Sequence, residues 1–140
     1  MVGREAAYSN KGVIGLTPLS RTSDGSGDTI DTQNYEAATV YFQIGTVLGT
    51  ISLTPELLES DSTGTGFTVV ASADLMGSFT EVTSSAGNNT VQKVGYKGTK
   101  RYLRVNDNRT GTSAVVTSAM VVLSNPRHVP VYDTVSSLLV

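Results

Sequence analysis

The chain has 140 residues, a formal net charge of −2 and no cysteine. This length is typical of one globular domain, so residues 1–140 are expected to form a single domain with its own core. The absence of cysteine excludes disulfide bonds and thiolate metal sites. No apolar run approaches the roughly 18 residues of a membrane-spanning helix. The N-terminus, with Arg4 and Glu5, lacks the apolar stretch of a secretion signal. We therefore expect no membrane partner.

Alternating apolar and polar residues predict short β-strands along the whole chain. Pro55 lies inside one of them and favours an edge or a bend at that point. Two of them, Thr90–Tyr96 and Lys100–Val105, are expected to form a hairpin joined near Gly98. The last strand, Ser113–Leu123, is expected to be the longest. The other expected strands are Val13–Leu16, Thr39–Ile44, Ile51–Leu57, Phe67–Ala71 and Phe79–Val82, with a single turn at Ala73–Gly77 between the last two.

Clusters of Ser, Asp, Asn and Gly separate these strands at short intervals, and long helical periodicity is missing. Many short strands spaced in this way are typical of a sandwich or barrel rather than of βαβ units. The sequence therefore predicts an all-β, single-domain antiparallel β-sandwich, jelly-roll-like, with about eight strands. Residues 1–19 and 126–140 are expected to be extended terminal arms.

The strand Val115–Leu123 is largely apolar on both of its faces. Val116, Met120 and Val122 share one face, whereas Val115, Ala119, Val121 and Leu123 share the other. A sandwich strand needs only one apolar face, the one that packs against the core. The second face is therefore covered either by the chain's own termini or by another subunit, and Val116, Met120 and Val122 are candidate interface residues.

The C-terminal segment is also apolar. Pro126 and Pro130 interrupt regular strand pairing there. Free tails tend to be polar, so this segment is expected to pack, either on its own domain or on a neighbour. Its candidate interface residues are Val129, Val131, Leu138 and Leu139.

Charge is distributed unevenly along the chain. Residues 1–81 hold three basic and ten acidic residues, a net charge of −7, whereas residues 82–140 hold seven basic and two acidic residues, a net charge of +5. Such asymmetry serves docking against an acidic surface or simply belongs to a solvated strand face. Lys97, Arg101 and Arg104 are the candidate docking residues. Direct nucleic-acid binding is not expected, because the chain as a whole is mildly acidic.

Residues that could support catalysis or metal binding are sparse. His128 is the only histidine, it lies between two prolines, and no nucleophile-elbow sequence accompanies it. Glu56, Glu59 and Asp61 cluster near a turn, where solvated carboxylates are ordinary. The stretch Asp24–Asp28 resembles a fragment of a calcium loop but lacks the full spacing and the terminal Glu. We therefore expect a protein that is not an enzyme and that uses no cofactor and no metal.

Several segments resemble small structural proteins of phages. These segments include Ile30–Tyr35, Ala38–Gly45, Leu57–Asp61, Ala73–Gly77, Lys93–Val105 and Val122–Pro126. In these segments the chain is similar to the decoration (cement) proteins of tailed-phage capsids, in particular to the type found in a Bordetella podophage. This resemblance implies a jelly-roll subunit present in many copies on the outer surface of the virion, bound over junctions between major capsid proteins of the HK97-like fold.

The function expected from these observations is structural. A clamp across a junction between capsid subunits stabilises the shell by its binding free energy and needs no active site. We expect a homodimer, with the major capsid protein as second partner, because two-fold symmetry is the commonest closed arrangement. The alternative is a β-sandwich binding module for carbohydrate or host-surface recognition on a virion or tail. The absence of Trp makes the carbohydrate alternative less favourable.

Overall fold

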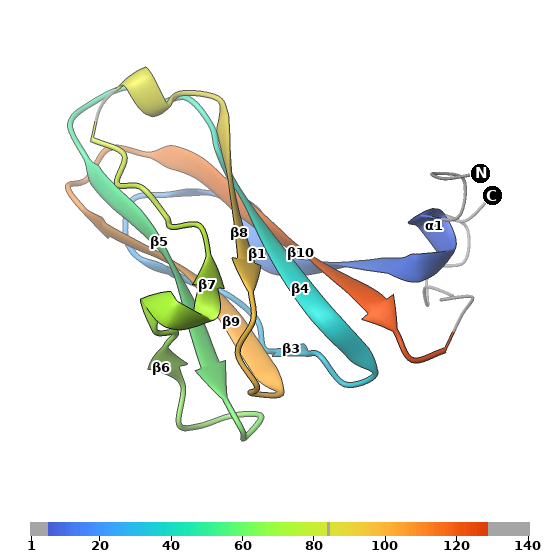
Figure 1. Cartoon of the computed structure of the whole chain (residues 1–140). Helices are drawn as coiled ribbons and strands as arrows, with labels where there is room; N and C mark the ends of the chain where they lie inside the picture. Colours follow the sequence, from blue (N-terminus) through green and yellow to red (C-terminus); the bar gives the residue numbers. More distant parts are fainter. Residues whose placement is uncertain (1–5, 84, 129–140) are drawn as a thin grey trace.

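The computed structural model describes residues 6–83 and 85–128, which fold into two antiparallel sheets that face each other (Figure 1). Sheet A has the strand order β1 (Asn10–Arg21), β10 (Val115–Pro126), β4 (Tyr35–Ile44), β8 (Thr90–Tyr96) and β7 (Leu75–Met76). Sheet B has the order β2 (Gly25–Ser26), β9 (Tyr102–Thr110), β5 (Ser52–Ser60) and β6 (Thr68–Val69), and β3 (Ile30–Asp31) also pairs with β9. Within these described residues, helical structure is limited to α1 (Ala6–Ser9) and the 3₁₀ turns η1 (Ser72–Asp74) and η2 (Ser85–Gly87).

The strand connections are those of a jelly roll. Strands β1, β10, β4 and β8 occupy one sheet and β2, β9, β5 and β6 the other. Every connection between these successive strands except β5–β6 crosses from one sheet to the other, as two interlocked Greek keys require. Strand β3 pairs with β9 on the same side as β2 does, further along the strand. Strand β7 is a short edge strand of sheet A. The predicted jelly-roll-like β-sandwich is thus confirmed.

Two local predictions were wrong. Strands β8 and β9 do not form a hairpin, because β8 belongs to sheet A and β9 to sheet B. The residues between them, 97–101, cross the gap of about 10 Å between the sheets, which a tight hairpin turn does not do. The second error is Phe79–Val82, in which only Val82 is paired, through a single bridge to Leu53.

The core lies between the two sheets and is filled by alternate residues of each long strand. In β10 the alternation is complete from Val115 to Leu123, with every second residue buried. Burying each such large side chain contributes about 1.5–3 kcal/mol. The fully buried apolar side chains with the largest volumes are Phe42, Leu16, Ile30, Leu53, Leu103, Leu123, Val40, Val94, Val105, Val115 and Val121.

One cluster of polar side chains is buried between the sheets. Asp107 of β9 pairs with Arg109 of the same strand, and both side chains are 0% exposed. The Thr117 hydroxyl of β10 donates to Asp107 Oδ2 over 2.7 Å, and Arg109 Nη1 donates to the carbonyl of Arg21 over 2.7 Å. Because β9 belongs to sheet B whereas β10 and β1 belong to sheet A, this cluster ties the two sheets together through charge-assisted hydrogen bonds.

The edge of the sandwich closes where β1 passes next to the segment that joins β2 and β3. Gly27 N donates to the carbonyl of Val105 over 2.9 Å. A Cβ atom on Gly27 would lie 2.0 Å from the carbonyl oxygen of Gly15 and 2.3 Å from that of Val105. Only glycine fits there, so Gly15 and Gly27 hold the two sheets together at this point.

The structure describes more of the expected N-terminal arm than of the expected C-terminal arm. Asn10–Leu19, within the expected N-terminal arm, belong to β1 and pair with β10. Arg127 and His128 follow the end of β10. Residues 1–5 and 129–140 lie outside the described part of the chain.

Candidate interaction face

The outer face of sheet A, the one turned away from the core, carries apolar side chains on every strand. Neighbouring strands place Ile14, Met120 and Tyr41 in one cross-strand row. A second row joins Val122 to Thr39, Gly95 and Met76. We call the following set the apolar face: Ile14, Tyr41, Met76, Val91, Val116, Met120 and Val122.

The side chains of the apolar face are open to solvent to an unusual degree for their type. Ile14 is 57% exposed, Met76 58% and Met120 48%. Scattered exposed apolar residues are ordinary, but a contiguous group on one sheet is typical of a contact surface. Polar residues also lie on this face. Thr39, Gln43 and Ser118 are uncharged, Ser118 donates to Gln43 over 3.0 Å, and Lys93 opposite Tyr41 adds a charge.

Glycines let the methionines lie flat on this face. A Cβ atom on Gly95 would lie 2.7 Å from Met76 Cε, so the Met76 side chain covers the backbone of β8. Met120 covers Gly12 in a similar way, with its sulfur 3.4 Å from the position of a Cβ there. Because methionine is flexible and polarisable, such side chains adapt to an irregular partner surface.

The three candidate residues of β10 lie on this face, but the candidate basic residues Lys97, Arg101 and Arg104 do not. Alternation within one strand placed Val116, Met120 and Val122 together, as predicted. It did not identify Ile14, Tyr41, Val91 or Met76, because membership of one sheet depends on long-range strand order. Alternation within Thr90–Tyr96 separates Val91 from Val94, which the structure buries. The sequence did not tell which of these two sides of the strand faces solvent.

The candidate basic residues lie elsewhere. Lys97 is exposed in the loop after β8, at the end of the sandwich. Arg101 donates to both carboxylate oxygens of Asp31, with Nε 2.9 Å from Oδ1 and Nη2 2.8 Å from Oδ2. This hydrogen bond holds the pKa of Asp31 below its ordinary value. Arg104 lies over the Phe67 ring, 4.1 Å from its centroid, and donates to the Thr29 hydroxyl.

The charge asymmetry of the sequence is used within the chain itself. Three ion pairs join an acidic residue of the first half to a basic residue of the second: Asp31–Arg101, Asp61–Lys100 and Glu36–Arg127. The basic stretch is therefore partly neutralised in the folded molecule. Docking by charge alone is correspondingly weaker than the sequence suggested, and the apolar face is the stronger candidate contact surface.

A polar hollow of about 340 Å³ lies at the end of the sandwich beside the 97–101 loop. The Tyr96 hydroxyl donates to Glu59 Oε2 over 2.5 Å and accepts a hydrogen bond from the Lys100 amide over 3.0 Å. Burial, together with this carboxylate, raises the pKa of Tyr96, so the phenol stays protonated. These contacts fix the loop to β5.

Residues with catalytic or metal-binding chemistry are dispersed. Within residues 6–83 and 85–128, no group of three or more His, Cys, Asp or Glu side chains is arranged to hold a metal ion. In the calcium-like stretch, Asp24 instead accepts a hydrogen bond from the Arg109 amide over 2.7 Å, which attaches the turn to β9. No helix in the described part of the chain has the length and hydrophobicity to cross a membrane. The remaining candidates, Val129, Val131, Leu138 and Leu139, lie outside the described residues.

Comparison with known proteins shows similarity of fold. No protein-family model matches the sequence, and no curated protein sequence matches it. The PBSX exported protein XepA shares the fold with a TM-score of 0.55 and 15% identity, over 89% of this chain and 40% of XepA. A structure of infectious bursal disease virus, Gx strain, aligns with a TM-score of 0.49 and 8% identity, over 86% of this chain and 34% of the viral chain. This chain thus spans well under two thirds of either structure.

The fold and the apolar face together define the class of molecule. It is a jelly-roll β-sandwich in which the outer face of one sheet, sheet A, carries a group of apolar side chains. At 15% identity, the similarity to XepA shows the shared sandwich fold.

Proposed function

We propose that this chain is a structural protein of a virion, and specifically a decoration (cement) protein on the outer surface of a tailed-phage capsid. The observation that carries the proposal is the apolar face, which spans all five strands of sheet A. A rigid sheet with one apolar outer side is suited to permanent contact with another protein surface. The resemblance of several segments to phage cement proteins supports the same conclusion.

The apolar face is proposed to bind a second copy of this chain. Val116, Met120 and Val122 lie on β10, an inner strand of sheet A that pairs with β1 on one side and β4 on the other. A two-fold contact brings the same patch of both copies together, so an apolar patch is self-complementary in a way that a patch of one charge is not. The dimer then presents two sandwiches to the shell, and the major capsid protein is the proposed second partner.

The role requires binding rather than catalysis. A decoration protein stabilises the shell because it binds the assembled particle and not the dissociated subunits. Stable contacts of this kind bury about 800 Å² on each partner. We therefore propose no enzymatic activity for the chain. Recognition of a carbohydrate or a host surface is the alternative that the experiment must separate.

Met120→Glu tests this proposal. We expect the variant to fold, because Met120 faces solvent, and to lose dimerisation and particle attachment by at least tenfold, because a charge would be buried in the contact (about 1.4 kcal/mol per tenfold). Thr54→Glu, on the outer face of sheet B, is the matched control and should leave both intact. Light scattering measures the dimer, and co-sedimentation with phage particles lacking the protein measures attachment. A monomeric Met120→Glu variant that still decorated particles at full occupancy would contradict the assigned face, and wild-type protein that bound glycans but no particles would favour the alternative.

A further inference from the structure

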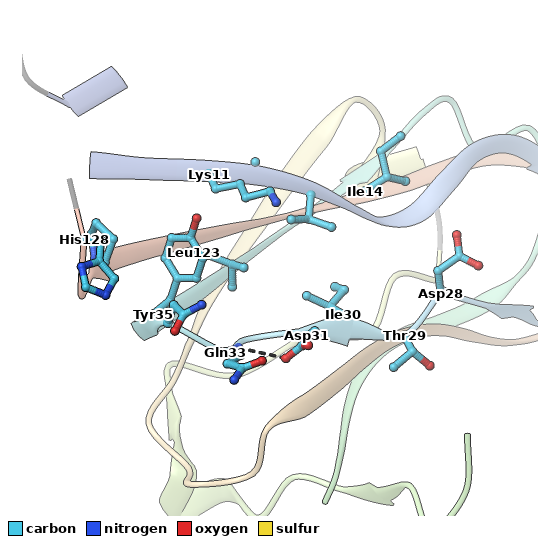
Figure 2. Close-up of a pocket in the computed structure, with 14 residues that line it drawn as sticks. Lys11, Ile14, Asp28, Thr29, Ile30, Asp31, Gln33, Tyr35, Leu123 and His128 are labelled. Carbon is cyan, nitrogen blue, oxygen red and sulfur yellow. Dashed lines mark hydrogen bonds between the residues drawn. The ribbon is translucent and has the colours of Figure 1, made fainter. Parts of the chain in front are cut away.

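A groove of about 800 Å³ lies between β1 of sheet A and β3 of sheet B (Figure 2). Its floor is formed by Val13, Ile30 and Leu123, of which Ile30 and Leu123 are 1% exposed, whereas the rest of the lining is mostly polar and includes Lys11 and Asp28. The close contact of Gly15 with Gly27 closes the sandwich at one end of the groove. From that contact toward Asn10 the edges of the two sheets separate. This combination of apolar floor and polar rim fits an extended peptide.

One wall of the groove is a regular strand edge. Asn10–Ile14 pair with β10 residue by residue, without a bulge. The register shifts of β1 come only after Ile14, and Pro18 lies within the second of them, between Leu16 and Leu19. Bulges and prolines protect an edge strand from further pairing, so the later part of β1 is protected and the part along the groove is not. Within the described residues, no strand pairs with the groove side of Asn10–Ile14.

The described part of the chain ends at this groove. His128, where the described part ends, is one of the lining residues (Figure 2). The sequence after it, Val129–Val140, has twelve residues, of which only Asp133 is charged and most are Val, Leu or Tyr. Twelve extended residues reach up to about 40 Å, whereas Asn10–Ile14 span about 17 Å. The segment is therefore long enough to turn back from His128 and run along β1.

We propose that the groove is a binding site for an extended apolar peptide, and that its occupant is the chain's own C-terminal segment, Val129–Val140. A tethered segment meets its site at an effective concentration in the millimolar range, so it outcompetes the same segment of a free second copy. Backbone pairing with the edge of β1 supplies affinity, and the apolar floor selects the side chains that point inward. This inference is independent of the proposed virion function.

Cysteine pairs test the occupant, since the natural chain has no cysteine that could interfere. Asp28→Cys on the groove rim is combined with Val135→Cys in the segment, in the full chain, and oxidised glutathione is added. We expect an intramolecular disulfide that forms at least tenfold faster than in the control pair Thr50→Cys with Val135→Cys. Thr50 is exposed and precedes the end of β5 that lies farthest from β3. Non-reducing electrophoresis and mass spectrometry distinguish disulfides within one chain from those between chains.

A third pair, Val122→Cys with Val135→Cys, places the partner cysteine on the apolar face instead. Faster cross-linking of this pair than of the Asp28→Cys pair would overturn the proposal, because the segment would then cover the outer face of sheet A. Disulfides between chains would also overturn it in favour of a second copy. Equal rates for all three pairs would show that the segment occupies no fixed site.

Hydrogen exchange gives a second readout without cysteines. Leu138→Asp with Leu139→Asp should release the segment and speed amide exchange of Asn10–Ile14 at least tenfold, while exchange in the central strand β4 stays unchanged. Unchanged exchange of Asn10–Ile14 would overturn the proposal, and faster exchange of both strands would do so as well, because it would assign those leucines to the core.

Discussion

Strands β9 and β10 follow each other in the chain and pack against the same core from opposite sheets, yet their outward side chains differ in kind. On β9 the outward residues are polar: Asn108 donates to Glu56 over 2.8 Å and Arg104 lies over the Phe67 ring, while Arg104 Nε and Asn106 Oδ1 are buried without a hydrogen-bond partner among the described residues. On β10 the outward residues Val116, Met120 and Val122 are apolar, and Ser118 between them donates to Gln43 over 3.0 Å, so the outer surface of sheet A is apolar around one polar pair.

This difference separates a face whose side chains contact one another within the single chain from one whose apolar side chains lie open to solvent. On the surface of sheet B, Asn108 and Arg104 already have partners in the chain. Apolar side chains that remain half exposed on sheet A gain free energy when another surface covers them, about 25 cal/mol for each Å². The apolar face is therefore the surface through which the proposed association would gain free energy.

The largest expected effect on stability concerns the inward side of β9, which buries the charged residues Asp107 and Arg109 in the core. Asp107→Ala leaves the Arg109 guanidinium buried without its counter-charge, which should lower the free energy of unfolding by about 3–5 kcal/mol. Urea denaturation followed by circular dichroism measures this loss.

A double variant is the control for that experiment. Asp107→Ala with Arg109→Met removes both charges, and it should recover a large part of the loss because no unpaired charge is then buried. Equal destabilisation of the single and double variants would show that the ion pair is not what Asp107 contributes.

Gly27→Ala should have the next largest effect. Its new methyl group would overlap the carbonyl oxygens of Gly15 and Val105, so β1 must move away from sheet B at a cost of about 1–3 kcal/mol. Gly64→Ala is the control, because nothing lies within 4 Å of a Cβ at that position. Equal urea midpoints for the two variants would contradict the tight closure at Gly15 and Gly27.

Alternation along single strands was enough to predict the sandwich and the faces of β10. It could not give the partner of each strand, which depends on contacts between residues far apart in sequence. The incorrect β8–β9 hairpin arose in this way: a short polar connection such as Lys97–Arg101 suits a hairpin as well as a crossing between sheets.

Of the apolar face, the sequence predicted only the residues that lie on a single strand. Val116, Met120 and Val122 came from β10 alone, whereas Ile14, Val91 and Met76 join them through the order of strands in sheet A. The basic residues were misleading because Asp31 and Asp61, which pair with Arg101 and Lys100, are distant in sequence. The groove, which depends on where β1 and β3 separate, had no signal in the sequence.

A smaller effect should distinguish the two outer faces directly. Arg104→Ala removes a contact that the isolated chain already makes, and it should destabilise the chain by about 0.5–1 kcal/mol. Val116→Ser changes a side chain with no polar partner, and it should alter the stability of the isolated chain by less than about 0.5 kcal/mol. Urea midpoints of dilute, monomeric protein measure both. If Val116→Ser destabilised the isolated chain more than Arg104→Ala did, the outward contacts of sheet B would not be the ones that stabilise the single chain.

The smallest expected effect is that of the surface pair Asp31–Arg101, which fixes the end of the sandwich beside the groove. Both side chains are close to half exposed, at 46% and 45%, so the pair should contribute less than about 1 kcal/mol. Its hydrogen bond lowers the pKa of Asp31 in the folded state below the ordinary value of 3.8. The contribution is therefore fully present above pH 3.8 and disappears as the pH falls through the lowered pKa. We expect Asp31→Asn to be slightly less stable than the natural chain at neutral pH and equally stable in strong acid. Urea midpoints at both pH values measure the difference, and Asp28→Asn on the same rim is an unpaired control. If Asp31→Asn stayed less stable than the natural chain in strong acid, Asp31 would act through its shape and hydrogen bonds rather than through its charge.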